Sequence, residues 1–159
     1  MFVRTLDELE RIGRIRFPVH SDMFRSARFL TAADGMGYSY NENRVKKGTD
    51  IVVWLKHHWE ANYIIAGKGE VTDLTTGEKY PLEAGVLYVV GPNDRHRLHL
   101  TEDSLYISIF CPPLRGDERF DKDGSYEASG PIEKTDRRMF AKRADEMRRA
   151  GMEMTAANG

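Results

Sequence analysis

Cysteine is almost absent from this chain, since Cys111 is the only one among 159 residues. A single thiol excludes an internal disulfide, and it also excludes a zinc site built from several cysteines. Few thiols and no disulfide are typical of proteins in a reducing compartment. We therefore expect a cytoplasmic protein.

The sequence also lacks a long hydrophobic run and a strong net charge. No apolar stretch approaches the roughly 18 to 20 residues that span a bilayer, and residues 1–16 carry charges where a secretory signal needs an apolar core. The formal net charge is -1, which gives no general attraction to nucleic acid or to an anionic membrane. We expect a small-molecule partner, and neither nucleic-acid nor membrane binding.

Short β-rich runs make up most of the sequence, and its 40% hydrophobic content is enough for one buried core. These runs alternate with turn signals such as Asp34-Gly35, Lys47-Gly48 and Thr76-Gly77. This alternation indicates an all-β sandwich or barrel and not βαβ units. The predicted strands are 27–31, 38–45, 51–55, 62–65, 69–74, 79–82, 86–90, 95–100 and 105–110.

Helical signals occur only at the two ends of the chain. Thr5-Leu-Asp-Glu8 resembles a capping box, which predicts a short N-terminal helix. After Pro131 the composition turns to Lys, Arg, Met and Ala, and residues 140, 144 and 147 recur at helical spacing. We therefore predict a domain over residues 1–130 and a C-terminal helical extension over 131–159, with its helix running from about 135 to 150.

Two glycine-bounded stretches carry the candidate metal ligands. The first runs from Gly48 through Glu60 to Gly67, and the second runs from Gly85 to His96. Their spacing resembles the two motifs of the cupin superfamily. The glutamate of the first motif and the histidine of the second are retained. Trp54 and Lys56 stand where the first motif usually has histidines.

Tyr88 supplies a possible third ligand. It lies eight residues before His96, so the two side chains face the same side if the strand between them is regular. Together with Glu60 they would form an oxygen and nitrogen site suited to Fe(II), Mn(II) or Zn(II), of which Fe(II) is our first choice. Each residue also has a structural alternative: an ion pair for Glu60, core packing for Tyr88 and a turn contact for His96.

Further polar residues are candidates for substrate contacts. His57 and His58 are adjacent, so they face opposite sides of a strand, and His58 shares the face of Glu60. Arg28 offers a planar fork for a carboxylate, and Glu118 offers a partner for an ammonium group or a general base. The alternatives are a supporting or surface position for His58 and solvated positions for the other two.

The sequence resembles the ectoine synthase family from about Met1 to Tyr126. The segments that carry the resemblance are Asp34-Gly-Met-Gly-Tyr-Ser-Tyr40, His58-Trp-Glu-Ala61, Gly67-Lys-Gly-Glu-Val71, Gly85-Val-Leu-Tyr88, Asp94-Arg-His96, Phe110-Cys-Pro-Pro113 and Asp121-Lys-Asp-Gly124. Residues after about Pro131 form an extension that this family usually lacks.

The resemblance implies a homodimeric, iron-dependent cupin, folded as a double-stranded β-helix. Such an enzyme closes N4-acetyl-L-2,4-diaminobutyrate to ectoine with loss of water, which makes it a hydro-lyase. The resemblance places the iron ligands at Glu60, Tyr88 and His96. The family's substrate-cavity positions retained here are Ser26, Arg28, Asn41, His58, Phe110 and Glu118.

Several cavity positions depart from the family pattern. Phe24 replaces a usual tryptophan, Asn43 a threonine, Leu55 an aromatic residue, Ser108 a cysteine and Phe120 a histidine. These replacements leave the three metal ligands in place and alter the cavity that holds the substrate. Phe24, Asn43, Ser108 and Phe120 therefore join the predicted substrate-binding residues.

The resemblance also assigns roles in catalysis. Arg28 is expected to hold the substrate carboxylate, and Glu118 and His58 are candidates for proton transfer. Tyr88 is a further candidate, because a metal would increase the acidity of its phenol. Two alternative functions remain: another metal-dependent cupin enzyme, a lyase or dioxygenase acting on a related amino-acid derivative, and a non-catalytic cupin that binds a small ligand.

Overall fold

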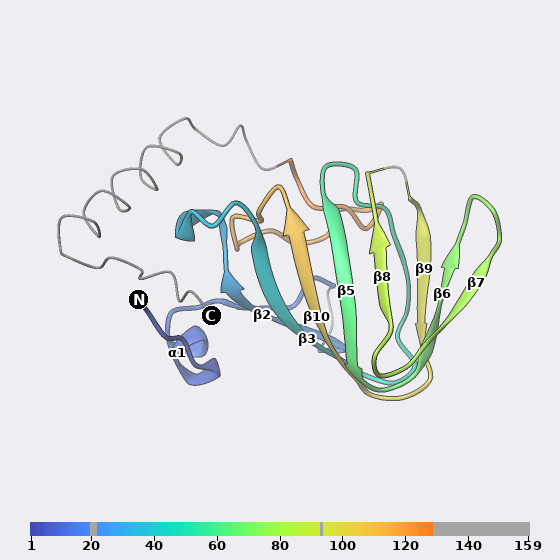
Figure 1. The fold of residues 1–159 in the computed structure, drawn as a ribbon, viewed down its shortest axis with the longest axis horizontal. Coiled ribbons are helices and arrows are strands. Elements are labelled where there is room, and N and C mark those ends of the chain that lie inside the picture. Colours follow the sequence, from blue (N-terminus) through green and yellow to red (C-terminus); the bar gives the residue numbers. More distant parts are fainter. Residues whose placement is uncertain (20–21, 93, 129–159) are drawn as a thin grey trace, which may run out of the picture. The chain divides into compact units, whose positions relative to one another are not determined.

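A computed structural model describes residues 1–19, 22–92 and 94–128 of the chain. In this part the protein is all-β apart from one short α-helix and one 3-10 helix (Figure 1). None of its helices is long and apolar enough to cross a membrane. The predicted C-terminal helix and the proposed extension over 131–159 lie outside the described residues.

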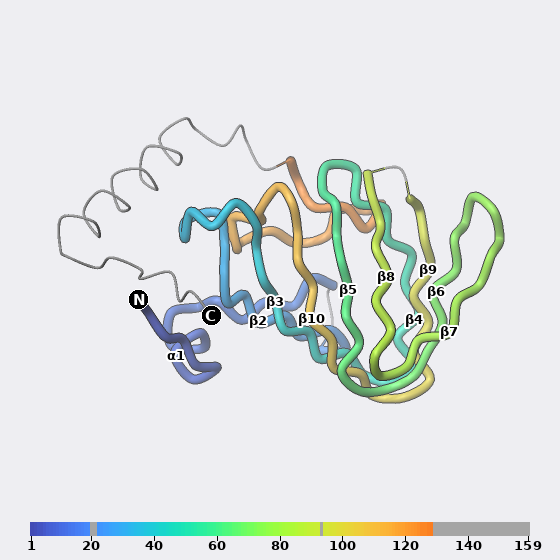
Figure 2. The backbone as a smooth tube through the Cα atoms, in the orientation of Figure 1, coloured from blue at the N-terminus to red at the C-terminus, as the bar shows by residue number. Residues whose placement is uncertain are grey.

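The strands form two antiparallel sheets. The strands are β1 (Ile15–Arg16), β2 (Phe24–Leu30), β3 (Ser39–Val45), β4 (Asp50–Val53), β5 (Trp59–Ala66), β6 (Gly69–Asp73), β7 (Lys79–Leu82), β8 (Leu87–Val90), β9 (His96–Leu100) and β10 (Ser104–Cys111). The six-stranded sheet has the order β1-β2-β3-β10-β5-β8, and the four-stranded sheet has the order β4-β9-β6-β7 (Figures 1 and 2). Neighbours in a sheet are often distant in sequence, which is the winding of a double-stranded β-helix.

The inner faces of the two sheets pack against each other. One buried cluster joins Phe24, Val45 and Tyr106 of the larger sheet to Leu98 and Leu100 of the smaller one. A second buried cluster gathers around Val53, Val90, Phe110, Leu114 and Tyr126. Tyr88 and Phe120 pack against both clusters. The polar groups of the candidate site therefore lie in an otherwise apolar interior.

Strand register places one row of polar residues on this inner face. Arg28 pairs with Asn41, Asn41 with Ser108, Ser108 with Asn62, and Asn62 with Tyr88, across β2, β3, β10, β5 and β8. Side chains at paired positions point to the same side of a sheet. One register therefore aligns five residues that are widely separated in the sequence.

The N-terminal helix α1 (Leu6–Arg11) begins as the sequence predicts. The Thr5 hydroxyl accepts a hydrogen bond from the Glu8 amide at 3.2 Å, and Leu9 is fully buried. Asp34, in the 3-10 helix η1 (Ala32–Asp34), forms ion pairs with Arg4 at 2.5 Å and Arg14 at 2.9 Å. These pairs attach the N-terminal segment to the connection between β2 and β3.

The predicted strands are all present, with bounds that shift by a few residues at their ends. The strand β1 and the helix η1 were not predicted, because two or three residues are too short to show a period. Residues 112–128 form neither helix nor regular strand, yet they bring Phe120 and Tyr126 into the interior. No periodic signal exists for such a segment.

Candidate metal and substrate site

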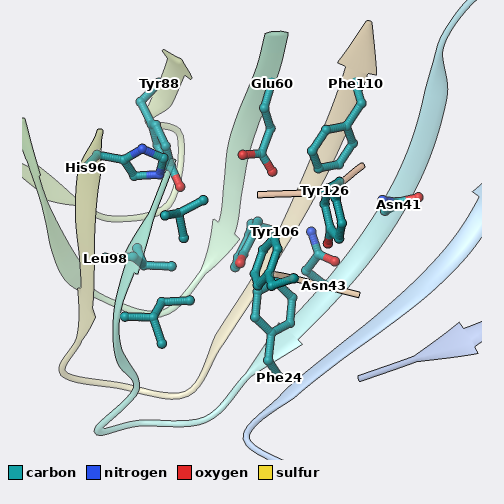
Figure 3. Close-up of a pocket in the computed structure, with 13 residues that line it drawn as sticks. Phe24, Asn41, Asn43, Glu60, Tyr88, His96, Leu98, Tyr106, Phe110 and Tyr126 are labelled. Carbon is teal, nitrogen blue, oxygen red and sulfur yellow. The ribbon is translucent and has the colours of Figure 1, made fainter. Parts of the chain in front are cut away.

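Glu60, Tyr88 and His96 converge on one cavity between the two sheets (Figure 3). The cavity has a volume of about 20 Å³, little more than one water molecule requires. Its walls are mostly aromatic and aliphatic. The lining residues are Phe24, Asn41, Asn43, Ile51, Val53, Glu60, Tyr88, His96, Leu98, Tyr106, Phe110, Phe120 and Tyr126.

Each of the three candidate ligands comes from a different strand. Glu60 is on β5, Tyr88 is on β8, which pairs with β5, and His96 is the first residue of β9 in the other sheet. The Tyr88 and His96 ring centroids are 6.2 Å apart. The two residues lie on separate strands, as the predicted strands 86–90 and 95–100 imply, so the condition of a regular strand between them is not met. They converge because β8 and β9 both turn an inner face to the cavity.

Burial disfavours the charged form of each candidate ligand. It raises the pKa of Glu60 to about 7, against the opposing effect of Asn62 and Ser108. Burial, and then the neighbouring Glu60, raise the pKa of Tyr88 well above its usual value. Burial lowers the pKa of His96, although the Asp94 backbone opposes this effect. An ion pair was the structural alternative considered for Glu60, but none involves this residue within the described chain.

The donor set fits a divalent metal ion. The His96 ring places Nδ1 3.1 Å from the Asp94 carbonyl oxygen. A proton on Nδ1 would leave the Nε2 lone pair free for a metal. A carboxylate, an imidazole and a phenol match Fe(II), Mn(II) or Zn(II). No three His, Cys, Asp or Glu side chains are grouped to hold a metal in the described residues, so the site requires the phenol.

An uncharged polar group adjoins Glu60. The Asn43 amide donates a hydrogen bond to Ser108 Oγ at 2.7 Å, and Ser108 donates a short one to Asn62 Oδ1. All three residues are buried. The amide oxygens of Asn41 and Asn43 and the amide nitrogen of Asn62 have no hydrogen-bond partner in the described chain. The interior therefore offers both unpartnered acceptors and an unpartnered donor.

The predicted substrate-binding residues fall into two groups. Phe24, Asn41, Asn43, Phe110 and Phe120 line the cavity, whereas Ser26 and Ser108 are buried outside its lining. The Phe24 and Phe120 ring centroids are 6.2 Å apart, and those of Phe120 and Tyr126 are 4.5 Å apart. Phe24 and Phe120 meet edge to face, Phe120 and Tyr126 are tilted by 32°, and the three rings form one wall of the cavity.

Arg28 and Glu118 bind each other and do not line the cavity. Their side chains are fully buried, and Arg28 Nη1 donates to Glu118 Oε2 at 2.9 Å. The backbone amides of Arg115 and Gly116 also donate to the Glu118 carboxylate, at 2.5 and 2.8 Å. Arg28 lies over the Tyr126 ring, 5.3 Å from its centroid. The structure thus gives both charged groups partners within the protein.

His58 lies outside the cavity lining. It precedes β5 and is fully buried. Its Nδ1 is 2.9 Å from the Pro112 carbonyl oxygen, and its Nε2 is 3.2 Å from the Glu127 carbonyl oxygen. Because each ring nitrogen faces a backbone acceptor, these contacts anchor both ends of residues 112–127. His57 is exposed, in agreement with the expected opposite orientation of the two histidines.

Three polar residues of this region were not predicted from the sequence. Tyr106 lies on β10, two residues before Ser108 and four before Phe110, so strand alternation could have indicated that Tyr106 faces the cavity. Asn62 is two residues after Glu60 and carried the same signal. Tyr126 reaches the cavity from the irregular segment, and the sequence carries no local signal for its position. The missed apolar lining residues are Ile51, Val53 and Leu98.

Comparison with known proteins identifies the family. The sequence model described as ectoine synthase matches residues 1–130. The chain belongs to the ectoine synthase family. It is 43% identical over 128 residues to an L-ectoine synthase of Desulfosudis oleivorans, covering 80% of this chain and 97% of that protein. It is 40% identical over 127 residues to an L-ectoine synthase of Desulfatibacillum aliphaticivorans, covering 79% and 96% of the two chains.

Solved structures agree with this family and with the predicted cupin fold. The crystal structure of an ectoine synthase from P. lautus matches with a TM-score of 0.65 and 34% identity, over 73% of this chain and 81% of that one. A cupin 2 conserved barrel domain protein from Salinispora arenicola matches with a TM-score of 0.54 and 18% identity, over 70% and 88%. The second likeness concerns the fold alone. The all-β cupin prediction is therefore confirmed.

Proposed function

We propose that this member of the ectoine synthase family cyclises N4-acetyl-L-2,4-diaminobutyrate to ectoine with loss of water. In this reaction the α-amine nitrogen attacks the acetamide carbonyl carbon, a C–N bond forms, and the carbonyl oxygen leaves as water with both amine hydrogens. The observation that carries the proposal is the convergence of Glu60, Tyr88 and His96 on one cavity in a chain of this family.

We propose Fe(II) as the bound metal, held by Glu60, Tyr88 and His96. When bound, it would supply a Lewis acid that polarises the acetamide carbonyl, an otherwise poor electrophile. Asp94 would help by keeping Nε2 of His96 unprotonated, through its carbonyl contact with Nδ1. Mn(II) and Zn(II) suit the same donors.

The cavity walls suit a small, folded substrate. The unpartnered amide oxygens of Asn41 and Asn43 are acceptors that match the N–H groups of the substrate. Phe24, Phe110 and Phe120 are apolar walls that exclude bulk water and favour a compact conformer. Holding the amine near the carbonyl in this way lowers the barrier by several kcal/mol. A cavity of about 20 Å³ must widen before substrate enters.

The contacts of Arg28, Glu118 and His58 support positioning roles for these residues. For Glu118 to act as a base, or for Arg28 to hold a substrate carboxylate, the buried pair between them would first have to separate. We propose that the pair fixes the Tyr126 ring, which lies against Arg28 and lines the cavity. Tyr88 is then the one predicted proton-transfer residue that faces the cavity directly.

Product NMR on anaerobic, Fe(II)-loaded protein tests the proposed function. We expect the substrate to be converted to ectoine, and we expect Glu60→Ala and His96→Ala to abolish both turnover and iron retention. Absence of ectoine with the wild type would contradict the proposal. Oxygen consumption in a separate aerobic assay would then indicate a dioxygenase, and ligand binding without turnover would indicate a binding protein.

A further inference from the structure

A chain of three uncharged side chains leads across the inner face of the large sheet towards Glu60. It begins at Asn43 on β3, passes through Ser108 on β10 and ends at Asn62 on β5. None of the three is more than 2% exposed. Water therefore does not compete for these hydrogen bonds, and each group depends on its protein neighbours.

The order of donors and acceptors fixes the orientation of the Asn62 amide. Ser108 Oγ accepts from the Asn43 amide, so its own proton is directed to Asn62 Oδ1. With Oδ1 accepting this bond, the Asn62 Nδ2 group is left as a donor. Nδ2 is buried and has no hydrogen-bond partner in the part of the chain that the structure describes. A buried donor of this kind requires a nearby acceptor.

Glu60 is the acceptor beside it. Glu60 and Asn62 are two residues apart on β5, so both side chains face the cavity side of the sheet. The carboxylate has no ion-pair partner among the described residues. Its orientation therefore depends on neutral donors.

We propose that Asn62 is a positioning residue for the Glu60 carboxylate. Its Nδ2 group holds one carboxylate oxygen and leaves the other oxygen directed at the metal, while Ser108 and Asn43 keep the Asn62 amide in that orientation. This inference rests on the metal site proposed above. Groups that orient a metal ligand in this way typically change metal affinity by about 10- to 100-fold when they are removed.

Binding of Co(II) to the purified full chain tests the proposal without any assay of activity. We expect Asn62→Leu to weaken Co(II) binding by about 10- to 100-fold and to alter its visible absorption bands, because the Glu60 carboxylate loses its orientation. Ser108→Ala should weaken binding in the same direction, and Ser108→Thr should restore it, since the hydroxyl is retained.

Ile64→Val is the matched control. Ile64 lies two residues beyond Asn62 on the same strand and face, within the apolar core cluster. This change should lower the melting temperature and leave both the Co(II) affinity and the absorption bands unchanged. Ile64→Val therefore distinguishes a general destabilisation of β5 from a specific effect on the Glu60 carboxylate.

Each outcome bears on one of the two proposals. If the wild type binds Co(II) and Glu60→Ala does not, but both Asn62→Leu and Ser108→Ala bind as the wild type does, the positioning role is overturned and the metal site stands. Equal weakening by Ile64→Val would also overturn it. If Glu60→Ala binds Co(II) as tightly as the wild type, the metal site is wrong and the positioning role falls with it.

Discussion

Two glutamates that point into the interior of this protein have opposite surroundings. Glu118 is neutralised by Arg28 and by backbone amides. Among the described residues, the side chains whose hydrogen bonding opposes the effect of burial on Glu60 are uncharged, and burial raises the pKa of Glu60 to about 7. A buried carboxylate without a counter-ion is costly unless a cation binds it. The contrast supports a structural role for Glu118 and a metal-binding role for Glu60.

Glu118→Gln tests this distinction at the scale of one residue. We expect the change to lower the free energy of unfolding by about 3 kcal/mol, because it leaves the Arg28 guanidinium buried without a counter-charge. Urea unfolding followed by circular dichroism measures the loss. Glu127→Gln, which removes an exposed partner of Arg115, is the control and should have no measurable effect. Equal stabilities of the two variants would contradict the assigned role of the buried pair.

At the scale of elements, the irregular segment 112–128 completes the cavity that the strands begin. His58 contacts the carbonyl oxygens of Pro112 and Glu127, near its two ends. Lys56, which precedes β5, forms an ion pair at 2.5 Å with Asp123 of the segment. Such contacts hold a segment that has no strand ladder of its own. They place its two aromatic side chains against Phe24 and Arg28.

The attachment of α1 depends on Asp34 and therefore on pH. Burial raises the pKa of Asp34, but Arg4, the Thr31 amide and Arg14 outweigh it, and the pKa falls to about 2 from an ordinary value of 3.8. A carboxyl whose pKa is lower in the folded than in the unfolded chain stabilises the fold at pH values above its unfolded-state pKa. This contribution, about 1 kcal/mol after solvent screening, should be lost as the pH falls from about 4 to about 2.

Asp34→Asn should remove this contribution. Thermal unfolding between pH 2 and pH 7 should show the variant less stable than the wild type near neutral pH, with the difference shrinking towards pH 2. Asp22→Asn, at an exposed ion pair with Lys46, is the control and should follow the wild-type curve. A constant difference between Asp34→Asn and wild type at every pH would contradict the assignment.

At the scale of the whole described domain, one outer face is unusually apolar. Strand register places Ile107, Tyr63 and Leu87 in one row and Ile109, Ala61 and Val89 in the next. Leu87 and Val89 are 59% and 53% exposed. The strand β8 also forms one edge of its sheet. Apolar surfaces of this kind commonly mark contacts between proteins, and a second copy of the chain would cover this one.

The predicted homodimer is therefore expected to use the outer face of β5 and β8. Val89→Lys should convert the dimer to a monomer in sedimentation velocity at micromolar concentration, because a buried ammonium without a partner opposes association. Lys79→Ala, on the other sheet, should leave the dimer intact. A wild-type monomer would contradict the predicted assembly, and a dimeric Val89→Lys variant would contradict the assigned face.

The sequence by itself determined the strands, the family and the three candidate metal ligands that meet in the cavity. Strand alternation and turn glycines are local properties, so the predicted strands match the observed ones closely. The positions of Glu60 and His96 were predicted from motif spacing. Tyr88 was predicted from the family resemblance and from its even separation from His96, although the regular strand on which that separation depended is not present. Alternation would also have found Asn62 and Tyr106, since each lies two residues from a recognised position on the same strand.

Only the tertiary structure decided which polar groups meet as partners. Arg28 and Glu118 are 90 residues apart, and no local pattern shows that they neutralise each other. The contacts of His58 with residues 112 and 127 depend in the same way on an irregular segment. The physical reason is that alternation sets the face to which a side chain points. Its partner is set by the register between distant strands and by the course of non-periodic backbone.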